Sequence, residues 1–331
     1  DRDRSHPLSR IRIGAVGRVP RHLRSLVAGP PVRRDRRRAC RVVPRRPGSA
    51  TAGHDLDAGG PDIGAGASRE APIGVFDSGV GGLTVARAII DLLPDEDIVY
   101  IGDTANGPYG PLPLAQVRAH ALAVADQLVD RGVKALVIAC NTAFTLGGEA
   151  LRIAFPDVPF IGTVPAIKPA AERTASGLIS VLATPGTVRR AYTRSLIESF
   201  AAQCHVRLVG SDNLAELAEQ HLRGEPVSDD ALRQEISDCF LEQNGQRTDI
   251  VVLACTHYPF LANRFRKIAP WPVDWLDPAE AIARQLVRVL EPDLASAPSE
   301  SADLAILTSG TRKPAIERLL AGFGLALMPG E

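Results

Sequence analysis

The 331-residue chain has few aromatic residues and no long apolar run. Both shortages limit the classes of protein to which it can belong. Aromatic side chains make up 5% of the residues, with two tryptophans and one methionine. No apolar stretch approaches the roughly 20 residues that a membrane-spanning helix needs, so we expect no membrane association. The apolar core of a signal peptide is also missing, which favours a cytoplasmic location. Hydrophobic residues at 45% and charged residues at 23% are typical of a globular protein.

Cysteine is scarce, and its spacing excludes two common uses. An odd number of cysteines without C-x-x-C spacing, in a chain of this size, argues against a disulfide framework. The same spacing does not supply the ligand set of a zinc site, so we expect no metal. Free thiols are typical of a reducing compartment. The five cysteines are Cys40, Cys140, Cys204, Cys239 and Cys255.

The formal net charge is zero, but the charges are unevenly distributed. Residues 1–70 carry 16 Lys and Arg against 7 Asp and Glu, whereas residues 71–331 carry 22 against 31. Nucleic-acid binding relies on basic surface, so the acidic excess after residue 70 argues against a nucleic-acid partner for the folded body.

Residues 1–70 form a segment of different composition, rich in Arg, Pro and Gly and without a sustained helical or strand period. Such a segment buries too little apolar surface to offset its ordering entropy, so we expect a disordered extension. The alternatives are a transit peptide or an arm that touches nucleic acid. Pro and Gly disfavour the amphipathic helix that a transit peptide needs.

Strand and helix patterns alternate after residue 70. An apolar strand at 73–76 leads into the glycine loop 77–82 and a helix over 83–93. A strand at 98–101, a helix ending near 130 and an apolar strand before Cys140 follow. Alternating strands and helices predict a mostly parallel sheet of the α/β class.

A second series with a similar pattern starts at Gly177. It has a strand at 179–182, a turn-rich loop at 183–187, a helix from 188 to about 202 and a strand at 206–209. Helices are predicted around 213–223 and 228–243, followed by an apolar strand that ends at Cys255.

The repeat of this order predicts a duplication: two similar doubly wound α/β domains with the active site in the cleft between them. A helix at 278–290 and a strand at 304–307 are expected to return to the first domain. The predicted division is a disordered extension over 1–70, a first domain over 71–165 plus 275–331, and a second domain over 166–274.

Cys140 and Cys255 each follow an apolar run of strand length and precede small polar residues. Ligands of open parallel sheets bind beyond the carboxyl ends of the strands, so each thiol falls where chemistry is usually placed. Two equivalent thiols suit the inversion of a stereocentre, which needs a base and an acid on opposite faces of one carbon. A thiol with a pKa of about 8.5 can serve in either role. The structural alternative is a small buried hydrophobe, and we assign it to Cys204 and Cys239, which lie in helical patterns.

Two ionisable neighbours are candidate assistants of these thiols. Asp77 follows the first strand and can pair with a substrate ammonium or accept a proton from a thiol; its alternative role is the N-cap of the next helix. His257 lies two residues after Cys255 and can tune its protonation; its alternative role is that of a loop histidine.

Neutral residues at the predicted strand ends are candidate substrate contacts. Asn141, Thr142 and Thr256 offer donors and acceptors beside the two cysteines. Thr184 opens a helix and can hold a carboxylate, although turn formation alone also explains its segment. Tyr109 and Gly110 lie in a stiff proline-rich loop.

Three other functions compete with acid–base chemistry on two thiols. Gly79-x-Gly81 after a strand suggests nucleotide binding, but the third glycine is missing and Asp77 would repel a pyrophosphate. A Cys–His hydrolase or acyl transferase leaves Cys140 unused. A non-catalytic amino-acid-binding protein stays open, because a cleft between two similar domains can simply close on a ligand.

Several segments together resemble glutamate racemases of the aspartate/glutamate racemase superfamily. They include residues 74–84, 108–110, 139–143 and 254–259, and the similarity runs from about residue 71 to the end of the chain. The resemblance implies interconversion of L- and D-glutamate without a cofactor, in a bacterial cytoplasm, to supply peptidoglycan synthesis. It also implies two similar α/β domains and a homodimer. Aspartate racemase is the nearest alternative.

The resemblance also implies roles for single residues. Cys140 would remove the α-proton of D-glutamate and Cys255 that of L-glutamate, assisted by Asp77 and His257 respectively. The implied substrate contacts are Asp77, Ser78, Tyr109, Gly110, Asn141, Thr142, Thr184, Thr256 and His257. The extension over 1–70 has no counterpart in that family. Phe144 replaces a small polar residue, and we expect it to alter the pocket wall.

Overall fold

The computed structural model describes residues 68–291, 294, 302–310 and 312–328. The predicted disordered extension lies outside the described residues, apart from its last three positions. Among the described residues, no helix combines the length and apolar character needed to cross a bilayer.

Six parallel strands of the described chain form the first sheet, in the order β12-β11-β2-β1-β3-β4. The strands β1, β2 and β3 are buried along their whole length, as expected for parallel strands covered on both faces. The members of this sheet are β1 (Ile73–Asp77), β2 (Ile98–Gly102), β3 (Ala135–Ile138), β4 (Phe160–Gly162), β11 (Leu304–Leu307) and β12 (Ala326–Leu327).

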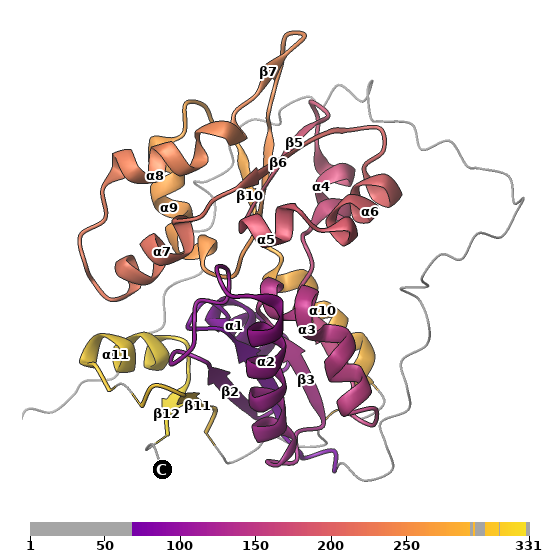
Figure 1. Cartoon of the computed structure of the whole chain (residues 1–331), viewed down its shortest axis with the longest axis vertical. Helices are drawn as coiled ribbons and strands as arrows, with labels where there is room; N and C mark the ends of the chain where they lie inside the picture. The colour runs from indigo at the N-terminus through magenta and orange to yellow at the C-terminus, as the bar shows by residue number, and fades with distance from the viewer. Residues whose placement is uncertain (1–67, 292–293, 295–301, 311, 329–331) are drawn as a thin grey trace, which may run out of the picture. The chain divides into compact units, whose positions relative to one another are not determined.

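Helices cover both faces of the first sheet, and together they form the first lobe (Figure 1). Val75 and Val137 pack toward one set of helices, whereas Phe76 and Ile138 pack toward the other, following the alternation of strand side chains. The first set comprises α1 (Leu83–Leu92), α10 (Ala279–Leu290) and α11 (Pro314–Gly322). The second set comprises α2 (Leu114–Val129) and α3 (Asn141–Ala154).

The second sheet contains four parallel strands of the described chain, in the order β10-β9-β5-β6. These are β5 (Leu178–Ala183), β6 (His205–Gly210), β9 (Ile250–Ala254) and β10 (Asp274–Leu276). One face is covered by α7 (Leu214–Leu222), α8 (Asp229–Ile236), α9 (Ala262–Ile268) and the short 3₁₀ helix η3 (Tyr258–Leu261). The other face is covered by α4 (Ile167–Arg173), α6 (Ala191–Phe200) and the neighbouring α5 (Pro185–Val188). This sheet and its helices form the second lobe.

The two sheets share one topology. In the first lobe the strands lie in the order β2-β1-β3-β4, and in the second the order is β6-β5-β9-β10. In both, the first strand of the lobe is central, the second lies on one side of it, and the third and fourth follow on the other side. The predicted α/β fold with two similar doubly wound domains is confirmed, and the common strand order is what a duplication leaves behind.

The C-terminal part of the chain extends the first sheet. The strand β11 pairs with β2, and α10 packs against α1, so the yellow C-terminal elements lie beside the indigo strands (Figure 1). The exact boundaries of the predicted three-part division stay a prediction.

Two predicted helices are too long. The helix predicted over 188–202 breaks at Arg189 and Arg190 between α5 and α6. The helix predicted over 228–243 ends at Ile236; a 3₁₀ turn, η2 (Ser237–Cys239), and a hairpin of β7 (Glu242–Gln243) and β8 (Gln246–Arg247) follow. Asn244 and Gly245 both have positive φ, the dihedral that a two-residue hairpin turn requires.

The position of Cys204 was also predicted wrongly. Because α6 ends at Phe200, Cys204 lies in the turn before β6 rather than in a helix, and Cys239 lies in η2. The short strands β4, β10 and β12 were not predicted at all.

A buried ion pair lies at the amino end of the first sheet. The Lys134 ammonium contacts the Glu96 carboxylate, and their side chains are 0% and 3% exposed. Lys134 also donates a hydrogen bond to the carbonyl of Arg69. Removing one charge of a buried pair takes away part of the compensation that the other buried charge needs, which costs more than the pair itself contributes.

We therefore expect Glu96→Gln to lower the free energy of unfolding by about 3 kcal/mol, measured by urea denaturation of the full chain. The matched control is Asp91→Asn, which breaks the exposed Arg87–Asp91 pair on α1 and should cost under about 0.5 kcal/mol. Equal costs for the two substitutions would contradict this account of the buried pair.

Candidate active site

The carboxyl ends of two adjacent strands in each lobe carry candidate site residues. In the first lobe β1 and β3 are adjacent, so Asp77 at the end of β1 lies next to the segment that carries Cys140. In the second lobe β5 and β9 are adjacent in the same way, which places Thr184 next to the segment that carries Cys255. The two cysteines thus occupy equivalent positions, each after the third strand of its lobe.

Residues from both lobes line one small pocket, called here the inner pocket. Its volume is about 20 Å³, which is room for about one water molecule, so the site is closed in this conformation. Ten of the predicted site residues lie in its wall: Ser78, Tyr109, Gly110, Cys140, Asn141, Thr142, Thr184, Cys255, Thr256 and His257.

Two hydrogen bonds join the lobes at the inner pocket. The Asn141 amide donates to the carbonyl of Ala254 at 2.9 Å. The Thr256 hydroxyl donates to the Asp77 carboxylate at 3.1 Å. Asp77 does not line the pocket itself; it lies behind the wall, fully buried, and positions Thr256.

The Cys140 thiol lies at the start of α3. Its sulfur accepts a hydrogen bond from the Ala143 amide and donates one to the Ser78 hydroxyl, both at 3.4 Å. Burial, and then the negative charge of Asp77, raise the pKa of Cys140 to about 12. At neutral pH Cys140 is therefore a neutral thiol that can donate a proton.

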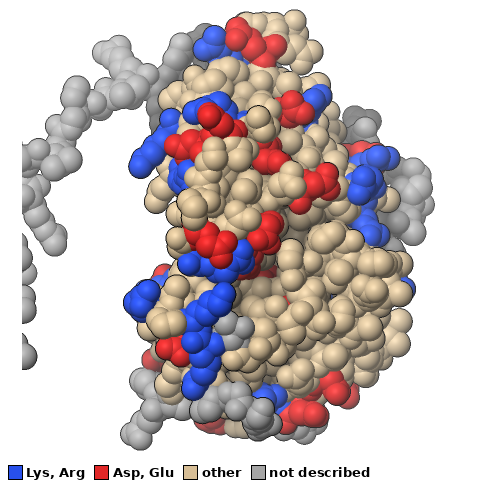
Figure 2. All heavy atoms as spheres, turned by 60° about the vertical axis from the view of Figure 1, so that its left-hand side comes forward, with Lys and Arg blue, Asp and Glu red and all other residues tan. Residues whose placement is uncertain are grey.

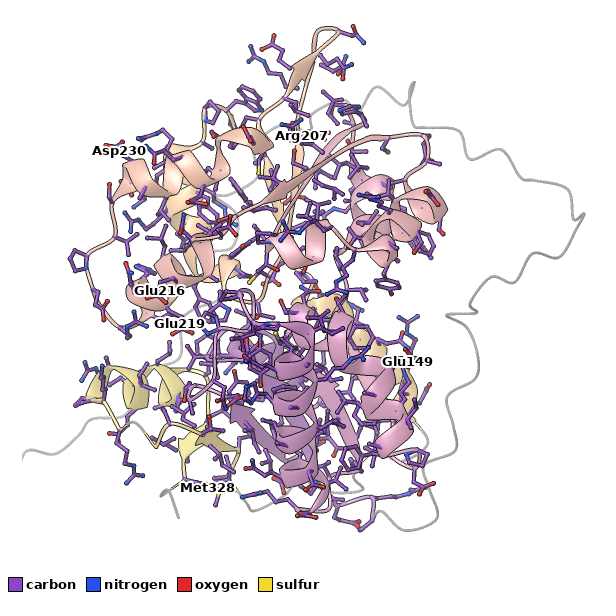
Figure 3. The ribbon with its side chains drawn as sticks, viewed as in Figure 1. Glu149, Arg207, Glu216, Glu219, Asp230 and Met328 are labelled. Carbon is purple, nitrogen blue, oxygen red and sulfur yellow. The ribbon has the colours of Figure 1, made fainter. Side chains whose placement is uncertain are left out.

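Cys255 lies in the opposite electrostatic environment. Its sulfur is 3.9 Å from Nδ1 of His257, and Nε2 of the same ring is 2.8 Å from the Glu219 carboxylate. Glu219 lies on α7, where Figure 3 labels it. Burial alone would lower the pKa of His257. The hydrogen bonds to Cys255 and Glu219, together with the negative charge of Asp77, outweigh burial and raise it well above its ordinary value. A protonated His257 therefore places a positive charge beside the Cys255 sulfur.

Asp77 is not a helix cap. The N-cap of α1 is Gly82, which has no side chain to cap the helix, whereas the Asp77 carboxylate accepts from the Gly79 amide at 2.9 Å. Burial raises the pKa of Asp77, and His257, Thr256 and Gly79 oppose this rise. The capping alternative is wrong, and the carboxylate faces the groups around the inner pocket.

The glycine loop after β1 packs directly on the histidine. A Cβ at Gly81 would lie 2.6 Å from Nδ1 of His257, and one at Gly79 would lie 2.9 Å from the Glu219 carboxylate. The glycines are thus explained by close approach to His257 and Glu219, so they need no bound nucleotide to account for them.

Tyr109 is held by a carboxylate that sequence reasoning did not select. Its hydroxyl donates to Asp103, which follows β2 and is 1% exposed. Asp103 also accepts from the Asn106 amide and, at 2.7 Å, from the hydroxyl of Thr308 after β11. The C-terminal segment thereby helps to fix the loop that carries Tyr109 and Gly110.

Glu219 was also missed, because it is one of two glutamates on an amphipathic helix and only the folded chain shows which of them faces His257. Phe144 was judged wrongly. It lines no described cavity, because its ring packs against Gly162, where a Cβ would lie 2.0 Å from it, and the Arg152 guanidinium lies 5.5 Å from its centroid. In the part of the chain that the structure describes, no three His, Cys, Asp or Glu side chains are grouped closely enough to hold a metal ion.

A sequence profile of Asp/Glu/hydantoin racemases matches residues 73–286. The chain belongs to this family. It is 59% identical over 261 residues to the glutamate racemase of Brucella anthropi, covering 78% of this chain and 94% of the relative. It is 57% identical over 257 residues to that of Agrobacterium fabrum, covering 77% and 94%.

Solved structures of the family are similar as well. Escherichia coli glutamate racemase, in complex with L-glutamate and the activator UDP-MurNAc-Ala, has a TM-score of 0.69 and 38% identity, covering 78% of this chain and 98% of that one. The Thermus thermophilus enzyme, in complex with β-chloro-D-alanine, has a TM-score of 0.61 and 33% identity, with coverage of 80% and 98%.

The contact between Glu219 and His257 leads to a prediction about protonation. Glu219→Gln removes a charge and weakens a hydrogen bond that both favour the imidazolium, so the pKa of His257 should fall. NMR titration of isotope-labelled histidines measures this, with the His257 signal assigned from a His257→Asn variant.

The matched control is Glu216→Gln, on the same helix less than one turn away. Glu216 is bound by Arg223 at 2.9 Å, and none of its described contacts involves His257. An unchanged His257 titration in Glu219→Gln, or an equal fall in the control, would show that Glu219 does not set the protonation of the ring.

Proposed function

We propose that this chain is an isomerase that interconverts L- and D-glutamate without a cofactor, using Cys140 and Cys255 as acid and base. One observation carries the proposal: two thiols, in equivalent positions of two similar lobes, line one pocket in opposite electrostatic environments. The membership of the racemase family, and relatives at 57% and 59% identity that are glutamate racemases, support the same activity.

The surroundings of the two thiols suit the reaction from L-glutamate. Cys255, beside the His257 imidazolium, takes the α-proton as thiolate, while the neutral Cys140 delivers a proton to the other face of the carbon. In the reverse direction Cys140 must first lose its proton. Asp77, whose own pKa burial raises, is the acceptor for that proton, so each thiol has an assistant suited to its role.

An unpaired buried acceptor supports the binding of an amino acid. The Asn141 side-chain oxygen has no hydrogen-bond partner among the described residues, although Asn141 lines the inner pocket. Buried polar atoms are rarely left unsatisfied, and a substrate ammonium would supply the missing donor. The backbone amides and hydroxyls of Ser78, Thr142, Thr184 and Thr256, with Gly110, are the proposed contacts of the two carboxylates.

The biological role follows from the product. D-glutamate is a building block of peptidoglycan, so we assign the chain to cell-wall synthesis in the bacterial cytoplasm. We further propose a homodimer, as is usual in the family, and light scattering of the purified chain at several concentrations tests this state.

The activity is tested with L-glutamate in deuterated water without added cofactor. The optical activity should decay, with deuterium appearing at the α-carbon. Cys140→Ala and Cys255→Ala should each lower kcat at least about 10³-fold, because each removes one of the two proton-transfer groups. Circular dichroism of the solution and mass spectrometry of the product measure the two effects.

The matched control is Cys204→Ala, which removes a thiol outside the inner pocket and should leave turnover near the wild-type value. Aspartate is tested in parallel, and preferential turnover of aspartate would reject glutamate as the substrate. Binding of glutamate without exchange of the α-hydrogen would instead identify an amino-acid-binding protein.

A further inference from the structure

A second, larger cavity adjoins the inner pocket. Its volume is about 890 Å³, and it shares five wall residues with the inner pocket, so the two cavities lie on opposite sides of the same wall. We call this cavity the vestibule. The shared residues are Pro108, Gly110, Thr142, Thr184 and Ala215.

The vestibule is much larger than the inner pocket, and part of it lies at the protein surface. The inner pocket holds about one water molecule, whereas the vestibule falls within the usual size range of ligand-binding cavities. Its wall includes the exposed side chains of Leu114 and Arg189, which place part of it at the surface. A ligand on its way to the two thiols can therefore pass through this cavity.

Two adjacent arginines lie in the vestibule wall. Arg189 ends α5 and Arg190 precedes α6, at the break between these helices. Among the described residues, neither guanidinium has an ion pair or a side-chain hydrogen bond, whereas Arg223 on α7 contacts three carboxylates. Arginine left without a carboxylate partner keeps its bidentate donors available for an anion.

The carboxylates in the vestibule wall do not fully neutralise the positive charge of the two arginines. Glu216 is bound by Arg223 at 2.9 Å, which leaves Asp212 as the other carboxylate in the wall. The inner pocket has no lysine or arginine in its wall, so the two arginines are a feature of the outer cavity alone.

The rest of the folded body repels anions. Residues 71–331 carry nine more acidic than basic side chains, and at the hollow between the lobes Figure 2 shows acidic side chains with basic ones beside them. Glutamate carries two carboxylates and one ammonium, so its net charge is negative. A negative substrate that approaches this acidic part of the chain gains from a local positive region that raises its concentration at the site.

We propose that Arg189 and Arg190 form an anion-capturing rim, which draws the dicarboxylate substrate into the vestibule before it reaches the thiols. This inference rests on the proposed function and adds to it the residues that set capture of the substrate. Because the arginines lie outside the inner pocket, they act on binding and leave proton transfer unchanged.

The test is the double variant Arg189→Gln/Arg190→Gln in the full chain, assayed for racemisation of L-glutamate at two ionic strengths. At about 0.02 M, kcat/KM should fall about fivefold through a higher KM, with kcat unchanged. At about 0.5 M, where salt screens the charges, the difference should shrink to less than about twofold. The single variant Arg189→Gln, at an exposed position, should show the same trend with a smaller effect.

The matched control is Arg194→Gln/Arg207→Gln. It removes the same charge from two exposed arginines of the second lobe that do not line the vestibule, and it should behave like the wild type. Equal losses in both double variants, or a loss that salt does not reduce, would overturn the capture role while racemisation by the wild type upholds the proposed function. A fall in kcat would also overturn it, and a wild-type chain that does not racemise glutamate would remove both proposals.

Discussion

The hydrogen bonds between Asp77 and Thr256, and between Asn141 and Ala254, hold the carboxyl ends of two parallel sheets against each other. Each lobe alone presents half a site, a strand-end thiol with polar neighbours. Neither half can act on both faces of one carbon. The rest of the site therefore depends on this contact between the lobes. The buried core behind each sheet keeps the strand ends in place to make it.

Duplication explains why the thiols are equivalent in position, and divergence explains why their neighbouring side chains differ in charge. The same strand order places Cys140 and Cys255 after the third strand of their lobes. Around Cys140 the chain supplies a buried carboxylate, and around Cys255 it supplies an imidazole backed by Glu219. Two copies of one fold have thus acquired complementary environments, which a reaction with one acid and one base requires.

Sequence patterns were sufficient to predict the long buried strands and the repeated order of strands and helices. The apolar runs before Cys140 and Cys255 predicted their strands, and the repeated pattern predicted the two lobes. Contacts made from distant helices could not be predicted. The sequence did not show which of the two glutamates on α7 contacts His257, and Phe144, two residues after Thr142, packs against Gly162. The helix predicted over 228–243 was too long because residues 237–243, which lead into a hairpin that turns at Asn244 and Gly245, were read as the continuation of a polar helix.

The tightness of the inner pocket bears on where the incoming hydrogen originates. With room for about one water molecule, the closed site leaves bulk solvent no direct path to a carbanion formed there. In the proposed reaction a hydrogen from solvent must first be loaded onto a sulfur, while the cleft is open. The hydrogen isotope at the α-carbon of the product then reports how often each thiol exchanged its hydrogen with solvent between turnovers. It therefore depends on the opening of the lobes as well as on the proton-transfer steps.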